Sequence, residues 1–199
     1  MENICHILMI CGSLRSGSTN AAVLHTVEDI VRGTAAGSTT GGLADSIADR
    51  VSVSIYDGLD RLPHFNPDAD HDPLDPTVVD LRTRIGSADA ILFSTPEYAG
   101  ALPGSFKNLL DWTVGGVEIC DKPVAWVNTS TAPTGAANAH DSLRKVLGYT
   151  GAEIVEAACT HVPVPRQAVD PDGLIRDPVL RAEITTVVTA LADHAERRR

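Results

Sequence analysis

One short segment of the chain concentrates hydrogen-bond donors, a cation and two glycines. Residues 12–20 have the sequence Gly-Ser-Leu-Arg-Ser-Gly-Ser-Thr-Asn. Gly12 and Gly17 allow the backbone to approach a ligand closely, and Arg15 supplies a planar fork of donors. Short polar side chains add further donors: Ser13, Ser16, Ser18, Thr19 and Asn20. This composition predicts a site for a small anion, in which a phosphate monoester would find a donor for every oxygen.

The position of this segment supports the same interpretation. It follows an apolar run and precedes a helical one, and the first N–H groups of a helix are unpaired and attract anions. The alternative is a simple capped turn, with Ser18 or Thr19 as the N-cap and Arg15 on the surface. The segment matches neither the ATP-type loop G-x-x-x-x-G-K-[ST] nor the dinucleotide motif G-x-G-x-x-G. A cysteine phosphatase is disfavoured, because Cys11 lies at a strand end and the loop would not surround its sulfur.

Strands and helices alternate along the rest of the chain. Short apolar runs predict strands at residues 4–11, 51–55, 88–95, 123–128 and 152–158. Helical periodicity predicts helices at residues 20–31, 77–85, 103–115, 135–147 and 177–197. Strands separated by helices favour parallel pairing with right-handed crossovers, which predicts an open, doubly wound α/β sheet. Ligands in that architecture bind outside the C-terminal ends of the strands.

We expect residues 1–199 to form a single domain. The stretch 33–42 is rich in Gly, Ser and Thr and indicates a flexible insertion, after which residues 43–49 would extend or cap the helical layer. Residues 57–76 are rich in Pro and Asp and predict a long loop. No apolar run reaches the roughly 18 residues that a membrane span needs, and we expect neither a signal peptide nor a membrane partner.

Charge and cysteine content narrow the possible partners and compartment. The net charge of −10, from 26 acidic and 16 basic residues, argues against binding to nucleic acids or anionic membranes. The four cysteines form no C-x-x-C pair and no His pair stands beside them at zinc-ligand spacing, so we expect no metal site. Buried free thiols indicate a reducing compartment, and we expect a cytoplasmic protein.

Two motifs together resemble a known family. Residues 12–20 resemble the G-S-x-R-x-x-S-x-N phosphate loop of the NADPH-dependent FMN reductases, a group that includes quinone, azo and chromate reductases. Residues 95–112, beginning Thr-Pro-Glu-Tyr and ending Lys-Asn-Leu-Leu-Asp-Trp, resemble the family segment P-E-Y-x-x-x-x-P-G-x-x-K-N-x-x-D-W. A weaker third match is Leu-Pro-His-Phe-Asn-Pro-Asp at 62–68. The resemblance covers residues 7–148 and implies a flavodoxin-like, three-layer fold whose five-stranded parallel sheet has the order 2-1-3-4-5.

The resemblance also implies roles for particular residues. The FMN phosphate would be bound by Ser13, Arg15, Ser18, Thr19 and Asn20. The isoalloxazine ring would be lined, partly through backbone groups, by Pro96, Glu97, Tyr98 and Ala99. Ser130, in the turn of residues 129–131, would close the other side. On the helix that follows, we interpret Lys107 and Asp111 as an ion pair and Trp112 as a packing residue, without a catalytic role.

The function implied is that of an FMN-dependent NAD(P)H oxidoreductase. Hydride would pass from NAD(P)H through FMN to a small acceptor by a ping-pong mechanism, the acceptor being a quinone, an azo compound, a metal oxyanion or a flavin. The cofactor carries this chemistry, so we expect no catalytic side chain. The resemblance further implies a homodimer or homotetramer.

Two other functions stay open at this point, namely a flavodoxin-type electron carrier and a non-catalytic flavin-binding sensor. The chain departs from the family in its insertion at 33–42. It departs again at 130–135, where Ser-Thr-Ala-Pro-Thr-Gly replaces the usual Gly-Gly pair, so the preference for NADPH or NADH is left open.

Overall fold

The computed structural model describes residues 4–35 and 47–198, and most of the expected insertion at 33–42 lies outside the described residues. The same holds for most of 43–49, of which residues 47 and 48 are helical. The strands are β1 (Cys5–Cys11), β2 (Val51–Tyr56), β3 (Ala90–Ser94), β4 (Pro123–Asn128), β5 (Glu153–Ile154) and β6 (Thr160–His161). The α-helices are α1 (Thr19–Ala35), α3 (Pro76–Ser87), α4 (Gly104–Asp111), α5 (Ala137–Tyr149) and α6 (Pro178–Arg197).

The sheet is parallel and has the order β2-β1-β3-β4-β5, with β6 also paired to β4. Its register runs from Cys5 opposite Val51 on one side of β1 and from Ile7 opposite Ala90 on the other. The predicted flavodoxin-like order 2-1-3-4-5 is therefore confirmed. This order reverses between β1 and β3, and ligands of doubly wound sheets bind beside such a reversal.

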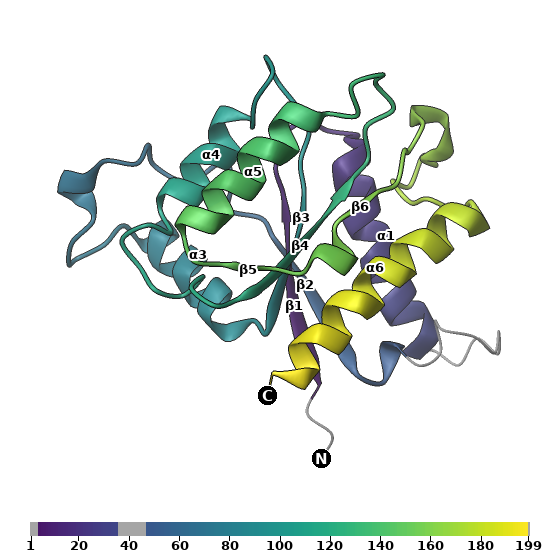
Figure 1. Ribbon diagram of the computed structural model, residues 1–199, viewed down its shortest axis with the longest axis horizontal. Helices are drawn as coiled ribbons and strands as arrows, with labels where there is room; N and C mark the ends of the chain where they lie inside the picture. Colours follow the sequence, from purple (N-terminus) through teal and green to yellow (C-terminus); the bar gives the residue numbers. More distant parts are fainter. Residues whose placement is uncertain (1–3, 36–46, 199) are drawn as a thin grey trace.

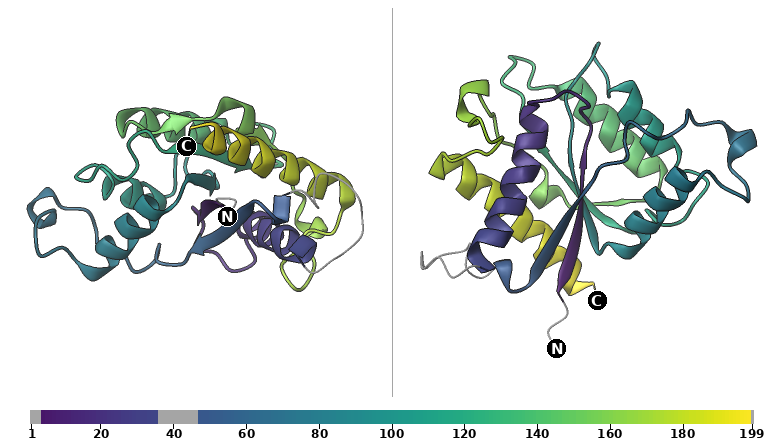
Figure 2. Two further views of the ribbon diagram at one scale, coloured as in Figure 1. Left: turned by 90° about the horizontal axis from the view of Figure 1, so that it is seen from below. Right: turned by 180° about the vertical axis from the view of Figure 1, so that it is seen from behind.

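Helices cover both faces of the sheet. Helices α1 and α6 lie on one face, and α3, α4 and α5 lie on the other (Figure 1; the edge-on view in Figure 2 separates the layers). Successive side chains of a strand point to opposite faces. Accordingly, Ile7 and Met9 belong to the core beneath α1 and α6, whereas Leu8 and Ile10 belong to the core beneath the other helices.

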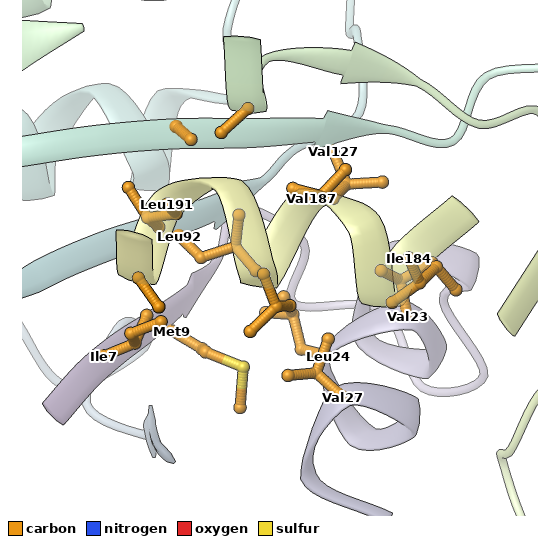
Figure 3. Packing of buried hydrophobic residues seen from close by; sticks show 14 of the residues in the cluster. Ile7, Met9, Val23, Leu24, Val27, Leu92, Val127, Ile184, Val187 and Leu191 are labelled. Atoms are coloured by element: carbon orange, nitrogen blue, oxygen red, sulfur yellow. The ribbon is translucent and has the colours of Figure 1, made fainter. Parts of the chain in front are cut away.

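The core beneath α1 and α6 fixes the first helix against the sheet. Leu24 and Val27 of α1 lie beside Met9 of β1, whereas Val23 lies beside Ile184 of α6 (Figure 3). Burial of each aliphatic side chain of this size stabilises the fold by about 1.5–3 kcal/mol. The N-terminus of α1 is thereby held at the C-terminal end of β1.

The predicted fifth strand at 152–158 is interrupted in the structure, and the prediction of one continuous strand was wrong. Ile154 pairs with Val124 and Thr160 pairs with Val127, and a short 3₁₀ helix, Glu156–Ala158, lies between them. The 3₁₀ helix accommodates the extra residues between the two pairings. Between these two pairings, the backbone N–H of Trp126 donates to the Cys159 sulfur instead of to a strand carbonyl.

Helix α4 is shorter than the predicted 103–115, since it ends at Asp111. The carbonyl of Trp112 accepts two hydrogen bonds from the Arg82 guanidinium, at 3.0 and 2.8 Å, and Arg82 also pairs with Asp70 at 2.8 Å. The Thr113 hydroxyl binds the Leu110 carbonyl at 2.7 Å. The side chains of Arg82 and Thr113 thus donate to the backbone carbonyls of Trp112 and Leu110, which would accept backbone N–H groups if the helix continued.

Candidate functional site

A cavity of about 360 Å³ lies where the loops after β1, β3 and β4 meet at one end of the sheet. This volume falls within the usual range for small-molecule sites. Its walls come from five segments: Arg15, Thr19 and Asn20; Thr95, Pro96 and Glu97; Thr129 to Ala132; Thr134 and Ala136; and Val164 and Arg166. The structure therefore brings together six of the residues predicted from sequence: Arg15, Thr19, Asn20, Pro96, Glu97 and Ser130.

Gly12 sets how closely the first two loops approach each other. Its N–H donates to the Ser94 carbonyl at 2.8 Å. A Cβ atom at this position would lie 2.2 Å from Thr95 Oγ1 and 3.0 Å from Phe106 Cδ1. Thr95 and Phe106 are themselves buried, so neither can move away easily. Gly12 is required for packing between the strand ends.

Asn20 links the first helix to the ends of β3 and β4. Its Oδ1 accepts hydrogen bonds from the Ser94 hydroxyl at 2.9 Å and from the Thr129 hydroxyl at 3.2 Å. Thr19 Oγ1 lies 3.3 Å from Thr129 Oγ1 as well. The Asn20 side chain is 5% exposed, and because its oxygen is occupied, its amide nitrogen is left as the donor on the cavity wall.

The N-terminus of α1 and Arg15 give this part of the cavity a positive character. The Ser18 carbonyl accepts the Ala22 N–H at 2.9 Å, which makes Ser18 the residue at the start of the helix. The N–H groups that follow have no intrahelical acceptor and carry partial positive charge. Arg15 is exposed, and among the described residues its guanidinium bonds only the Gly17 carbonyl, at 3.3 Å, so this group has unused donors.

Two other predicted phosphate-loop residues lie outside this cavity. Ser18 is buried beneath the start of α1. Ser13 lines a separate hollow of about 240 Å³, beside Cys11 and Tyr56, and its hydroxyl accepts the Arg15 N–H at 3.3 Å. Ser13 therefore shapes the turn that presents Arg15.

The predicted ring-binding residues lie on a tight hairpin after β3. Tyr98 and Ala101 exchange backbone hydrogen bonds of 3.0 and 3.1 Å, while Ala99 and Gly100 have φ values of 51° and 71°. Two successive positive φ values define a type I′ turn, which matches the twist of a hairpin. Pro96 and Glu97 line the cavity, whereas Tyr98, 50% exposed, and Ala99 project beyond it.

The Glu97 carboxylate has a structural partner. Its Oε2 accepts the Ala139 N–H at 3.0 Å, in the first turn of α5. The residue before this helix, Ala136, provides no side-chain cap, so Glu97 satisfies a helix terminus from another loop. A carboxylate also interacts favourably with the positive end of the helix dipole. Glu97 thereby ties the loops on the two sides of the cavity.

The loop after β4 is held by side chains at both ends. Asn128 Oδ1 accepts the Ser130 N–H at 3.0 Å, and Asn128 Nδ2 donates to the Gly135 carbonyl. His161 Nε2 donates to the Ser130 carbonyl at 2.7 Å. These contacts fix Ser130 on the cavity wall.

Among the cavity residues that sequence reasoning did not assign to the site, Val164 and Arg166 come from a segment outside all of the predicted site segments. The Val164 N–H donates to the Thr129 carbonyl at 3.1 Å, which carries the chain past the end of β4 and toward α1. Arg166 begins a short 3₁₀ helix, Arg166–Ala168, immediately afterwards. The available signal was a lone arginine in a proline-rich stretch downstream of the last strand, where the chain returns to the ligand-binding end.

His140 is a buried histidine beside this region. Its Nδ1 donates to the Ala136 carbonyl at 2.9 Å, and its Nε2 is buried and without a hydrogen-bond partner among the described residues. Burial lowers the pKa of His140 below its ordinary value. The imidazole is consequently neutral at pH 7, with the proton on Nδ1.

The part of the second family motif that lies in and just after α4 proves to be structural. Lys107 and Asp111 form the expected ion pair at 2.5 Å. The Asn108 amide nitrogen and the Trp112 indole nitrogen both donate to the Pro63 carbonyl, at 2.9 and 2.8 Å, and the Trp112 ring meets Phe65 edge-on at 5.0 Å. Trp112 is buried, as predicted for a packing residue. The motif thus holds the loop after β2 against α4.

Within residues 4–35 and 47–198, no group of three or more His, Cys, Asp or Glu side chains could hold a metal ion. None of the helices in the same ranges is long and apolar enough to cross a membrane.

Comparison with known proteins places this geometry in context. Residues 5–164 match the family model described as NADPH-dependent FMN reductase. The chain is 30% identical over 193 residues to an NAD(P)H-dependent FMN reductase of Pseudomonas aeruginosa, covering 96% of this chain and 95% of that protein. It is 27% identical over 201 residues to a quinone reductase of Escherichia coli, covering 99% and 98%.

A solved structure gives the same result. The flavoenzyme FerB of Paracoccus denitrificans, an NAD(P)H:(acceptor) oxidoreductase, superposes with a TM-score of 0.71 at 27% identity and covers 98% of both chains.

Proposed function

Because the chain belongs to the NADPH-dependent FMN reductase family, we propose that the cavity described above binds FMN and admits NAD(P)H and a small electron acceptor beside it. The protein is an FMN-dependent NAD(P)H oxidoreductase, with FMN as cofactor and NAD(P)H as reductant. The chemistry that FMN supplies when bound is two-electron transfer between NAD(P)H and the acceptor. One observation carries the proposal. The N-terminus of α1 with Arg15 and the loops after β3 and β4 line one cavity, at the point where the strand order of the sheet reverses.

The phosphate of FMN is assigned to the end of the cavity nearest α1. Arg15 offers unused guanidinium donors, and the Thr19 hydroxyl and the Asn20 amide nitrogen lie on the same wall. Ser18 contributes by starting the helix whose free N–H groups point to this end. Ser13 acts by positioning Arg15 through the bond to its backbone.

The ring is assigned to the space between the loops after β3 and β4. Pro96 and Glu97 form one wall, with Tyr98 and Ala99 at its rim, and Ser130 lies on the opposite wall. Backbone groups on such walls hydrogen-bond the ring nitrogens and carbonyls of a flavin and tune its potential. Among the described residues that line the cavity, Glu97 carries the carboxylate nearest to the ring space. Because this carboxylate accepts the Ala139 N–H of α5, we assign it no acid–base role.

The acceptor is proposed to be a small redox-active organic molecule, with quinones as the first compounds to test. The relatives named as quinone reductase and as NAD(P)H:(acceptor) oxidoreductase support this choice. The test is an absorbance spectrum of the protein with FMN, without oxygen, before and after NADPH or NADH, followed by a benzoquinone. Bleaching by a nicotinamide cofactor and recovery on quinone addition are expected. Bound flavin that stays oxidised with both cofactors would refute the proposal and favour an electron carrier or a sensor.

We also propose that the protein is a homodimer or a homotetramer. A hollow of about 590 Å³ between α4 and α5 has a largely apolar lining, and Tyr149 in it is 86% exposed. Val114 in the same hollow is 65% exposed and the nearby Val117 is 81% exposed. Contiguous exposed apolar surface of this kind marks association sites. Light scattering should give a molar mass of twice or four times the 21.0 kDa of one chain. Tyr149→Lys should lower this mass toward that of the monomer, because it places a charge in the apolar hollow.

The remaining expectations are proposals of the same kind. Two apolar clusters pack on the two faces of a single sheet, which supports one domain over the whole chain. Within the described residues, Cys11, Cys120 and Cys159 form no disulfide, which supports the cytoplasm as the compartment.

A further inference from the structure

We propose that Arg166 is a second phosphate-binding cation of the flavin site, acting with Arg15 from the opposite side of the α1 N-terminus. This inference rests on the proposed placement of FMN in the cavity. It assigns a role to a residue that lies in a separate segment, far downstream of the phosphate loop.

Arg166 differs from almost all other arginines of the protein in having no acidic partner. Among the described residues, nine arginines contact a carboxylate: Arg32, Arg50, Arg61, Arg82, Arg84, Arg144, Arg176, Arg181 and Arg198. In a chain with net charge −10, an arginine without such a partner is unusual. Arg15, Arg166 and Arg197 have none in the described ranges, and of these three Arg15 and Arg166 line the same cavity.

The backbone brings Arg166 to the phosphate end of that cavity. Val164 is hydrogen-bonded to the Thr129 carbonyl, and the Thr129 hydroxyl lies 3.3 Å from Thr19 Oγ1 and 3.2 Å from Asn20 Oδ1. Arg166 follows Val164 by two residues, so it approaches the first turn of α1 from the β4 side. Arg15 approaches the same turn from the β1 side.

The negative charge of a phosphate monoester is large enough to require both arginines. A phosphate monoester carries about −1.5 to −2 charges at pH 7. A helix N-terminus contributes about +0.5 and one guanidinium +1, which falls short of a full dianion. A second guanidinium completes the neutralisation and can bind phosphate oxygens in pairs.

The experiment compares FMN with riboflavin, which lacks the phosphate. Flavin fluorescence quenching on titration gives the Kd of both ligands for the full-length protein stripped of flavin. Arg166→Ala should weaken FMN binding by about tenfold or more while leaving riboflavin binding unchanged. The FMN Kd of Arg166→Lys should lie between those of the wild type and Arg166→Ala, because lysine keeps the positive charge and lacks the planar guanidinium donors. Arg197→Ala is the matched control, since Arg197 is exposed at the end of α6 without a carboxylate partner in the described ranges.

Other outcomes would overturn the inference. Equal weakening of FMN and riboflavin would mean that Arg166 supports the fold. An unchanged FMN Kd with a higher KM for NADPH, but not for NADH, would assign Arg166 to the 2′-phosphate of the co-substrate. If Arg15→Ala weakens FMN selectively and Arg166→Ala does not, only this inference fails. If neither variant changes the preference for FMN over riboflavin, the placement of FMN itself is wrong.

Discussion

Replacing Asn20 by alanine tests whether this side chain is the junction between α1, β3 and β4. The substitution removes two hydrogen bonds, at 2.9 Å from Ser94 and 3.2 Å from Thr129. Each contributes about 0.5–1.5 kcal/mol. The loss is limited because the Ser94 hydroxyl also faces the Val127 carbonyl at 3.0 Å, and Thr129 keeps its contact with Thr19 at 3.3 Å. Alanine also has a higher helix propensity than asparagine, which offsets a few tenths of a kcal/mol.

The expected net destabilisation of Asn20→Ala is therefore about 1–2 kcal/mol, and a domain of this size loses about 2–4 °C in Tm for each kcal/mol. Differential scanning fluorimetry without flavin measures this change. Asn138→Ala is the matched control, because the same substitution is made on the exposed face of α5. Saturating FMN should raise the Tm of the wild type more than that of Asn20→Ala, since the amide nitrogen is also removed. Equal Tm values for Asn20→Ala and Asn138→Ala would refute the prediction that Asn20 joins α1 to β3 and β4.

Three further predictions concern other parts of the protein. Gly12→Ala should lower the free energy of unfolding by about 1–3 kcal/mol or more, because the new Cβ would overlap with Thr95. Gly33→Ala is the control and should be neutral or stabilising, because the space around its Cβ is open. Urea unfolding measures the free energy of unfolding of both variants. Burial lowers the pKa of His140, so the unfolded chain takes up this proton at a higher pH than the folded one. Stability should fall as pH drops below about 6.5, and the difference in urea midpoint between pH 7.5 and 5.5 should narrow in His140→Asn. Iodoacetamide should modify the exposed thiol of Cys120 before the three less accessible ones, and peptide mass spectrometry would show another order if the packing is wrong.

The elements nearest to simple patterns were predictable from the sequence. The apolar run that became β1 and the one that became β4 were located within a residue, because a buried parallel strand is apolar on both faces. Asp177 precedes α6, and its carboxylate accepts the Val179 and Leu180 N–H groups, which is the expected signal of a helix start. The position of Arg15 and Asn20 at the junction of a strand and a helix was predictable for the same local reason, since a polar, glycine-containing loop follows an apolar run there, and their role as FMN ligands stays a prediction.

Features that depend on distant segments were not predictable in this way. The break between β5 and β6 follows from how residues 153–161 pair with β4, which no local periodicity encodes. The bond from Ala139 to Glu97 joins two loops, so the sequence suggested Glu97 as a ring contact without its second role at α5. Arg166 reaches the cavity only because Val164 extends the edge of the sheet beside Thr129.

The interruption between β5 and β6 has a consequence for how the protein behaves at high concentration. A long, regular edge strand offers a row of unpaired N–H and C=O groups on which another chain can add a strand and start aggregation. Here the sheet ends beyond β4 in two very short strands separated by a 3₁₀ turn, where Glu156 pairs with Arg144. An incoming strand would find at most a few consecutive partners and a charged obstacle between them. The same local irregularity that divides the predicted fifth strand thus protects this side of the sheet from intermolecular strand addition.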